Sequence, residues 1–235
     1  MFEKREGIAW LTLNRPHVLN AMNTQMRDEL WTVMEAVRDD PDTAVLVVKG
    51  AGDRAFSAGA DVEEFGTAPS YIEARRARRE RDLWQLMLDI DKLLIAAMHG
   101  YALGAGCEMS MCCDLRVASE DARFGLPEVK LGYIPSAGGT QLLPRTIGTG
   151  TAMEMILTGD DIDAVTALRL GLVHKVVARE RLYEEAEAWA RELITRSPAV
   201  LRYAKEAVTR GLEVSLEEGL AMERRLGRLL TASSV

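Results

Sequence analysis

Apolar and polar residues alternate along the first two thirds of the chain in segments whose lengths suit strands and helices. Apolar runs at Ile8–Leu13, Ala44–Lys49 and Leu94–Met98 are typical of short buried strands. Between the first two, Thr24–Asp39 repeats apolar residues at helical spacing, and Asn23 precedes it as a candidate N-cap. This alternation of strands with a helix predicts an α/β core.

The middle of the chain continues this pattern. Ser70 and Glu73 match a capping box, which predicts a long helix from Ser70 to about Asp89. Ala102–Cys113 is almost wholly apolar, as expected of a buried helix, and Leu115–Ala118 resumes the strand pattern. The core is therefore expected to hold further strand and helix units.

The last third of the chain is predicted to be helical. The expected breaks from Ser136 onward are Pro144, Thr158-Gly159, Gly171 and Pro198. A second capping box, at Ser215 and Glu218, opens the final helix. We therefore divide the chain into a core of residues 1–190 and a helical region of residues 191–235, with a soft boundary because no linker separates them.

Composition and charge narrow the class of protein. With 235 residues and a net charge of −7, we expect a soluble globular protein that does not bind nucleic acid or anionic membranes in general. No apolar run approaches the ~20 residues of a membrane span, and the N-terminal residues lack a signal-peptide core. The three cysteines are an odd set in an apolar segment, which favours a reducing, cytoplasmic compartment.

Three stretches rich in small residues carry the candidate chemistry. Glu108 follows Gly104-Ala105-Gly106, Glu128 follows Gly125-Leu126-Pro127, and Ser57–Asp61 lies upstream. Small side chains let backbone N–H groups approach a ligand, and such groups stabilise an oxyanion that develops on a carbonyl. Together with two carboxylates, they indicate proton transfer beside a carbonyl, without a metal.

Each stretch also has a simpler explanation. Gly104 and Gly106 could allow tight helix packing, Asp61 could cap a helix, and Glu128 could be a solvated loop acid. Their joint occurrence and spacing favour a site over these explanations.

Motifs in a fixed order along nearly the whole chain carry a resemblance to a known family. They are Asn14–Pro16, Asn20–Asn23, Ala55–Asp61, His99–Glu108, Phe124–Glu128, Leu131–Gln141, Leu157–Gly159 and Gly171–Val173. On these motifs the chain resembles the enoyl-CoA hydratase/isomerase (crotonase) family and is most similar to an enoyl-CoA hydratase. The resemblance implies a crotonase-like fold of class α/β, a spiral core of (ββα) units with a C-terminal helical trimerisation region. It also implies a homo-trimer, or a hexamer of two trimers.

The resemblance further implies an activity. The substrate would be an acyl-CoA thioester whose oxygen sits in an oxyanion hole between the N–H groups of Ala60 and Ala105, with Glu108 and Glu128 as catalytic acids. Members that keep both glutamates are typically hydratases, hydro-lyases that add water reversibly across the 2,3 double bond of a 2-enoyl-CoA. No cofactor is expected, since coenzyme A is part of the substrate.

Other residues are expected to contact the substrate or its coenzyme A moiety. They are Ala58, Gly59, Asp61, Val62, Gly104, Ser136, Arg15 and His17. Ser136 departs from the glycine common in the family, so the acyl pocket is expected to differ in width or polarity. Lysines common around the first oxyanion segment are absent, and Arg54 and Glu63 stand there instead.

Alternatives from two classes stay open. Double-bond isomerases, thioester hydrolases and ring-acting hydratases of the same family would share the oxyanion pair. A non-catalytic relative that binds RNA through a basic helix is the other class, and its candidate residues are Arg75, Arg76, Arg78, Arg79 and Arg81. Interleaved acidic residues favour a solvated helix face instead, so no nucleic-acid partner is expected. The histidines His17, His99 and His174 lack metal-ligand spacing, so no metal site is expected.

Overall fold

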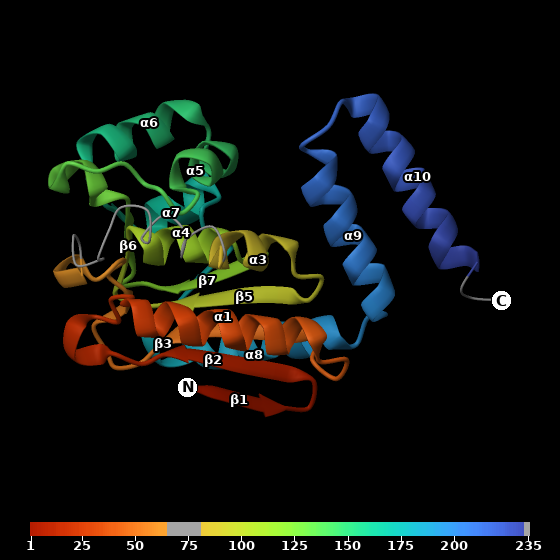
Figure 1. Cartoon of the computed structure of the whole chain (residues 1–235), viewed down its shortest axis with the longest axis horizontal. Coiled ribbons are helices and arrows are strands. Elements are labelled where there is room, and N and C mark those ends of the chain that lie inside the picture. The colour runs from red at the N-terminus through yellow and green to blue at the C-terminus, as the bar shows by residue number, and fades with distance from the viewer. Residues whose placement is uncertain (65–80, 233–235) are drawn as a thin grey trace.

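A large, mostly parallel sheet forms the base of the fold (Figure 1). The computed structural model describes residues 1–64 and 81–232. The strands, in spatial order, are β1 (Phe2–Arg5), β2 (Ile8–Leu13), β3 (Val45–Gly50), β5 (Leu93–Met98), β7 (Leu115–Ser119) and β10 (Lys175–Val177). β1 is antiparallel to β2, and the other neighbouring pairs are parallel. β3 and β5 are buried on both faces, which explains their continuous apolar sequences.

A smaller sheet receives the chain after three of these strands. Its strands, in spatial order, are β4 (Ala55–Ser57), β6 (Tyr101–Leu103), β8 (Arg123–Gly125) and β9 (Ile162–Asp163). The chain passes from β3 to β4, from β5 to β6 and from β7 to β8, and helical segments follow each of these pairs. This repetition is the predicted spiral of strand–strand–helix units, so the predicted fold class is confirmed.

Some helices pack on the two faces of the large sheet, and others lie beside it. They are α1 (Thr24–Asp39), α3 (Leu83–Asp89), α4 (Ala105–Met111), α5 (Gly139–Ile147), α6 (Thr149–Thr158), α7 (Ala164–Leu170), α8 (Leu182–Ile194), α9 (Pro198–Gly211) and α10 (Leu216–Ala232). Short 3₁₀ turns are η1 (Pro16–Val18), η2 (Val62–Glu64), η3 (Pro127–Leu131) and η4 (Arg179–Arg181). Apolar residues of α1, α3 and α4 pack on one face, and those of α8 pack on the other. Of the helices in the described ranges, none has the length and apolarity needed to cross a bilayer.

Several local predictions are confirmed. β2 and α1 have the predicted bounds, and the Asn23 side chain caps α1 by accepting a hydrogen bond from the Met26 N–H at 3.0 Å. The capping box before α10 is also formed, since the Ser215 N–H donates to Glu218 Oε2 at 3.0 Å and the Glu218 N–H donates back to Ser215 Oγ at 3.3 Å.

Some predictions that were based on apolar runs, or on proline as a helix breaker, were wrong. Residues 102–113 are not one helix, because Tyr101–Leu103 pairs with its neighbours in the small sheet as β6 and α4 starts only at Ala105. Pro144 does not end a helix but lies inside α5, and the break falls at Gly148. The short strands β1, β9 and β10 were not predicted, since two to four exposed or half-exposed residues carry little periodic signal.

The predicted helix from Ser70 to Asp89 has a different start. Its final turns are α3, but Arg81 and Asp82 are not helical, and Asp82 caps α3 by accepting from the Gln85 N–H at 3.0 Å. The Ser70–Glu73 capping box lies outside the described residues, as do Arg75, Arg76, Arg78 and Arg79 of the basic cluster.

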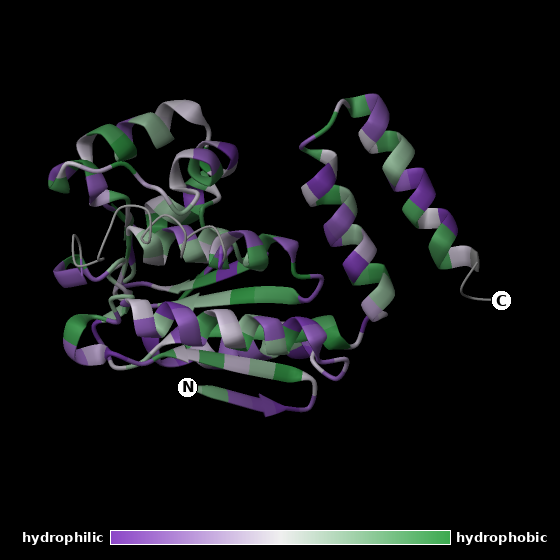
Figure 2. Cartoon of the chain, viewed as in Figure 1, coloured by the Kyte–Doolittle hydropathy of each residue, from purple (hydrophilic) through white to green (hydrophobic). Residues whose placement is uncertain are grey.

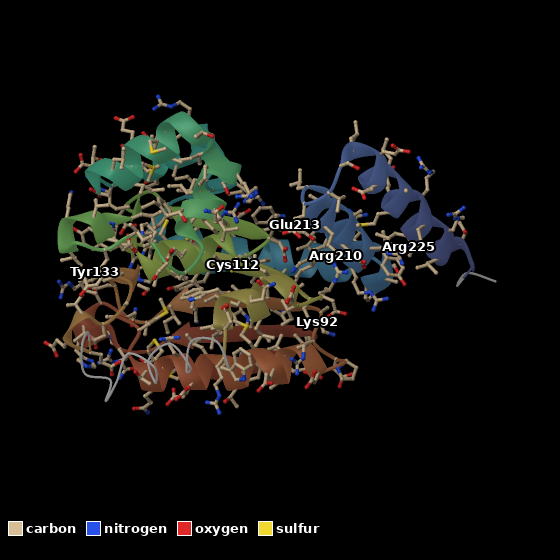
Figure 3. All side chains as sticks on the ribbon, turned by 45° about the horizontal axis from the view of Figure 1, so that its top comes forward. Lys92, Cys112, Tyr133, Arg210, Glu213 and Arg225 are labelled. Atoms are coloured by element: carbon tan, nitrogen blue, oxygen red, sulfur yellow. The ribbon has the colours of Figure 1, made fainter. Side chains whose placement is uncertain are left out.

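The last two helices, α9 and α10, form an arm beside the core (Figure 1). Lys205 of α9 anchors the arm, because its Nζ lies 2.9 Å from Asp114 Oδ2 and 2.9 Å from the Lys92 carbonyl oxygen. Apolar positions recur along both helices (Figure 2), and the labelled arm residues Arg210 and Arg225 lie far from Tyr133 of the core (Figure 3). α8 packs on the sheet and runs past the predicted boundary at residue 190, and the division into two regions stays a prediction.

Candidate active site

Two glycines bring the small-residue stretches together. β4 leads into Ala58–Ala60 and β6 leads into Gly104, and the two strands are parallel neighbours. A Cβ on Gly59 would lie 2.9 Å from the Leu103 carbonyl oxygen and 3.2 Å from the Ala105 nitrogen. Gly59 has φ +100° and Gly104 has φ +51°, values that residues with a side chain rarely adopt. Glycine therefore permits both the turn and the close approach of the two segments.

The amides of Ala60 and Ala105 are the open donors of these segments. In residues 1–64 and 81–232, neither N–H has a hydrogen-bond acceptor. Their neighbours are occupied, because Asp61 N–H donates to the Met22 carbonyl at 3.1 Å and Gly104 N–H donates to the Gly125 carbonyl at 2.9 Å. Ala105 is the first residue of α4, where a helix leaves N–H groups without internal partners. The two amides predicted to form the oxyanion hole therefore have no internal acceptor in the described residues, and their role in binding stays a prediction.

Glu108 is a buried carboxylate held by two backbone amides. It lies in the first turn of α4 with 2% of its surface exposed. Its Oε1 accepts hydrogen bonds from the N–H groups of Ala137, at 2.9 Å, and Gly139, at 2.7 Å. Burial raises the pKa of Glu108, and these two hydrogen bonds oppose the shift because they favour the ionised form.

Glu128 has the contrasting environment. It lies in η3, and its Oε1 would be 2.9 Å from a Cβ on Gly104, so this carboxylate is next to the second oxyanion segment. Its Oε2 is buried and has no hydrogen-bond partner among the residues that the structure describes. Burial raises the pKa of Glu128 to about 7, a backbone hydrogen bond opposes the shift, and the charge of Glu108 adds to it. Near neutral pH this group is therefore present in both protonation states, as a proton donor and acceptor requires.

Some of the residues predicted to contact the substrate or its coenzyme A moiety hydrogen-bond to other residues of the chain. Arg15 Nη1 donates to Asp61 Oδ2 at 2.8 Å and to the Ala21 carbonyl at 2.7 Å, and this contact lowers the pKa of Asp61. The pair joins the η1 turn to the first oxyanion segment. His17 in η1 and Val62 in η2 are exposed, and Ser136 is exposed immediately before the segment whose amides hold Glu108.

Three residues of the site have roles that sequence reasoning missed. The amides of Ala137 and Gly139 hold Glu108, although the small-residue run that contains them was recognised as a motif. Asn20 is fully buried, and its Nδ2 donates to the carbonyls of Ala51, at 2.9 Å, and Ala55, at 2.8 Å. Its signal was the motif Asn20–Asn23, but only the folded chain shows that it ties the η1 turn to β4.

Other chemistry is not supported by the described residues. In residues 1–64 and 81–232, no group of three or more His, Cys, Asp or Glu side chains could hold a metal ion. Cys107, Cys112 and Cys113 are buried free thiols, and burial raises the pKa of each, so none is an activated nucleophile.

The sequence matches known proteins over nearly its whole length. The profile of the family described as enoyl-CoA hydratase/isomerase matches residues 3–234. A probable enoyl-CoA hydratase of Mycobacterium tuberculosis is 42% identical over 226 residues, which cover 96% of this chain and 87% of the relative. A crotonyl-CoA hydratase of Syntrophomonas wolfei is 40% identical over 224 residues, which cover 95% of this chain and 86% of the relative.

Solved structures agree with the sequence matches. An enoyl-CoA hydratase from Bacillus anthracis superposes with a TM-score of 0.92 at 36% identity, covering 97% of this chain and 89% of that chain. An enoyl-CoA hydratase from Mycobacterium smegmatis superposes with a TM-score of 0.91 at 31% identity, covering 97% and 89% of the two chains. The crotonase-like fold is therefore confirmed, and the chain belongs to the enoyl-CoA hydratase/isomerase family.

Proposed function

We propose that this chain is an enoyl-CoA hydratase, which adds water reversibly across the 2,3 double bond of a 2-enoyl-CoA thioester. One observation carries the proposal: the buried Glu108 and the half-buried Glu128, which differ in hydrogen bonding, lie beside two backbone amides that have no acceptor in the described chain. The named activities of the relatives support the same reaction class. Retention of both glutamates favours hydration over isomerisation or hydrolysis.

In the proposed mechanism the thioester oxygen accepts hydrogen bonds from the N–H groups of Ala60 and Ala105. As water adds to carbon 3, charge moves onto this oxygen, and the two donors stabilise the enolate; one such donor is typically worth about 3–4 kcal/mol of barrier. Glu108, as carboxylate, takes a proton from the attacking water, and Glu128, as acid, gives a proton to carbon 2. In the reverse direction the roles exchange. The unequal environments of the two acids suit this division.

The substrate, with its coenzyme A moiety, is assigned to the region around the oxyanion segments. We include Ala58, Gly59, Val62 and Gly104 in this region, with His17 at its edge and Ser136 beside the acyl group. Arg15 and Asp61 are paired with each other, so we assign them to holding the η1 turn in place for the substrate. No further cofactor is needed for the proposed reaction.

We also propose that the arm mediates assembly into a trimer or a hexamer. Apolar side chains on α9, α10 and the turn between them are exposed in the single chain, among them Leu212 at 81% and Leu216 at 78%. Covering such residues with a second copy would remove apolar surface from water. A reducing, cytoplasmic compartment remains the proposed location, given three buried free thiols.

The experiment that tests the activity measures loss of the conjugated absorbance of crotonyl-CoA. We expect Glu108→Gln and Glu128→Gln each to lower kcat by at least about tenfold. This is a conservative expectation, because a general acid or base typically contributes about a hundredfold or more to the rate. Binding of butyryl-CoA, measured by calorimetry, is expected to persist in both variants. Glu120→Gln is the matched control, because Glu120 is an exposed acid in the turn after β7. Turnover at the wild-type level in either site variant contradicts the proposal.

A further inference from the structure

The two oxyanion segments depend on two chain crossings between the sheets. After β3, which ends at Gly50, the chain crosses to β4 and reaches Ala60; after β5, which ends at Met98, it crosses to β6 and reaches Ala105. Within each sheet the neighbouring strands are held by ladder hydrogen bonds. At the crossings, residues 51–54 and 99–100, this regular pairing stops. The spacing of the two donors therefore depends on what joins the crossings.

The side chain of Tyr183 joins them from the opposite face of the large sheet. Tyr183 lies near the start of α8, and its hydroxyl donates to the Gly50 carbonyl oxygen at 3.1 Å and contacts His99 Nδ1 at 3.2 Å. One hydroxyl thus touches the last residue of β3 and the first residue after β5. The ring itself is fixed by Lys49 Nζ, 4.9 Å from its centroid, and by an edge contact with the His99 ring at 6.3 Å.

The donors and acceptors of the two side chains show how Tyr183 and His99 can hydrogen-bond to each other. A tyrosine hydroxyl has one proton, and it goes to Gly50, so the His99 contact is a hydrogen bond when Nδ1 carries the imidazole proton. His99 is fully buried, and burial lowers its pKa to about 4, so the ring is neutral and its Nε2 is an acceptor. That Nε2 has no partner in the described chain. Within the described residues, the Tyr183 hydroxyl is the side-chain group that hydrogen-bonds to this ring, and a backbone contact with Gly52 in the first crossing also acts on it.

Backbone hydrogen bonds at and next to His99 connect this residue to both crossings. Its carbonyl accepts from the Phe56 N–H of β4 at 2.8 Å, and Tyr101 N–H donates to the Arg54 carbonyl at 3.2 Å. Gly100, with φ +53°, has no free space, since a Cβ there would lie 2.1 Å from the Arg54 carbonyl oxygen. A shift of His99 therefore moves β4 relative to β6, and with them the segments that carry Ala60 and Ala105.

We propose that Tyr183 is a positioning residue that, through His99, holds the two oxyanion amides at the spacing a thioester oxygen requires. The inference rests on the proposed function. It concerns alignment in the transition state, because ground-state binding of the acyl-CoA uses many other contacts, whereas the developing enolate depends on both amides at once.

The test is Tyr183→Phe, which keeps the ring and removes the hydroxyl. We expect kcat for crotonyl-CoA to fall about fivefold, the effect of one lost hydrogen bond, with KM changed less than about twofold. The carbonyl stretch of bound butyryl-CoA, measured by isotope-edited infrared difference spectroscopy, should move part of the way back to its frequency in water. Tyr203→Phe is the control, since Tyr203 lies on α9 in the arm and its ring contacts Arg202.

A double-mutant cycle makes the route through His99 testable. We expect His99→Gln to lower kcat and the double variant to show no further loss, since both changes break one connection. A purely structural role lowers the melting temperature but leaves the carbonyl frequency and kcat unchanged, and that result overturns the proposal. Failure of the proposed function looks different: the wild-type protein itself then neither hydrates crotonyl-CoA nor shifts the carbonyl frequency of bound butyryl-CoA.

Discussion

Glu108 and Glu128 are the same residue type at one site, yet their surroundings differ. Two backbone amides hold one oxygen of Glu108, whereas Glu128 has a buried oxygen that no group in residues 1–64 and 81–232 hydrogen-bonds. Donors to a carboxylate favour its ionised form, and unrelieved burial favours the neutral form. The difference shows how a fold separates the proton affinities of two identical acids, so that one suits a base and the other an acid.

The largest expected effect comes from a substitution that disturbs the hydrogen bonds holding Glu108. A Cβ on Gly139 would lie 2.8 Å from Glu108 Oε1, so Gly139→Ala must displace the carboxylate or its clamp. Overpacking of this kind costs about 1–3 kcal/mol, and we expect kcat to fall about tenfold to a hundredfold. Gly150→Ala in α6 is the control, because no atom of the described residues lies within 4 Å of a Cβ there. Equal kcat for the two variants in a crotonyl-CoA assay would show that the clamp is dispensable.

An intermediate effect is expected on the Glu128 side. Gly104→Ala places a Cβ 2.9 Å from Glu128 Oε1, but this carboxylate has an oxygen without a partner and is freer to move. We expect kcat to fall about threefold to tenfold. Gly148 also has a positive φ, but no atom of the described residues lies within 4 Å of a Cβ built on it. Gly148→Ala is therefore the control that separates backbone strain from displacement of the Glu128 carboxylate. Both variants are compared by steady-state kinetics. If Gly148→Ala lowers kcat as much as Gly104→Ala does, backbone strain alone explains the effect.

The smallest effect concerns stability. The pKa of Glu128 in the folded chain is about 7, above its ordinary 4.5, so the folded state keeps this proton longer than the unfolded state. Its contribution is fully present below pH 4.5 and is lost as pH rises through about 7. Between pH 5 and pH 8 we expect the unfolding free energy of the wild type to fall by about 1 kcal/mol more than that of Glu128→Gln, after allowance for solvent. Parallel urea titrations measure the difference, and identical pH dependence in the two proteins speaks against a buried, proton-holding Glu128.

Local patterns predicted what local physics decides. Asn23 and Ser215 were recognised as helix caps because a cap depends on residues within one turn, and β2 was recognised because its apolar run is bounded by polar turns. The strand β6 was missed inside an apolar run, since its identity depends on pairing with β4 and β8, which lie distant in the chain. Helix capping is local, and sheet pairing is not.

By itself, the amino-acid sequence determined the family, the alternation of strands and helices, and which residues could form the site, because small residues and acids recur in recognisable motifs. Only the tertiary structure decided that Arg15 pairs with Asp61, that Ala137 and Gly139 hold Glu108, and that Tyr183 reaches His99 across the sheet. These contacts join segments from 29 to 84 positions apart. Their physical basis is hydrogen bonding between groups that folding alone brings within 3.5 Å of one another, so no local pattern encodes them.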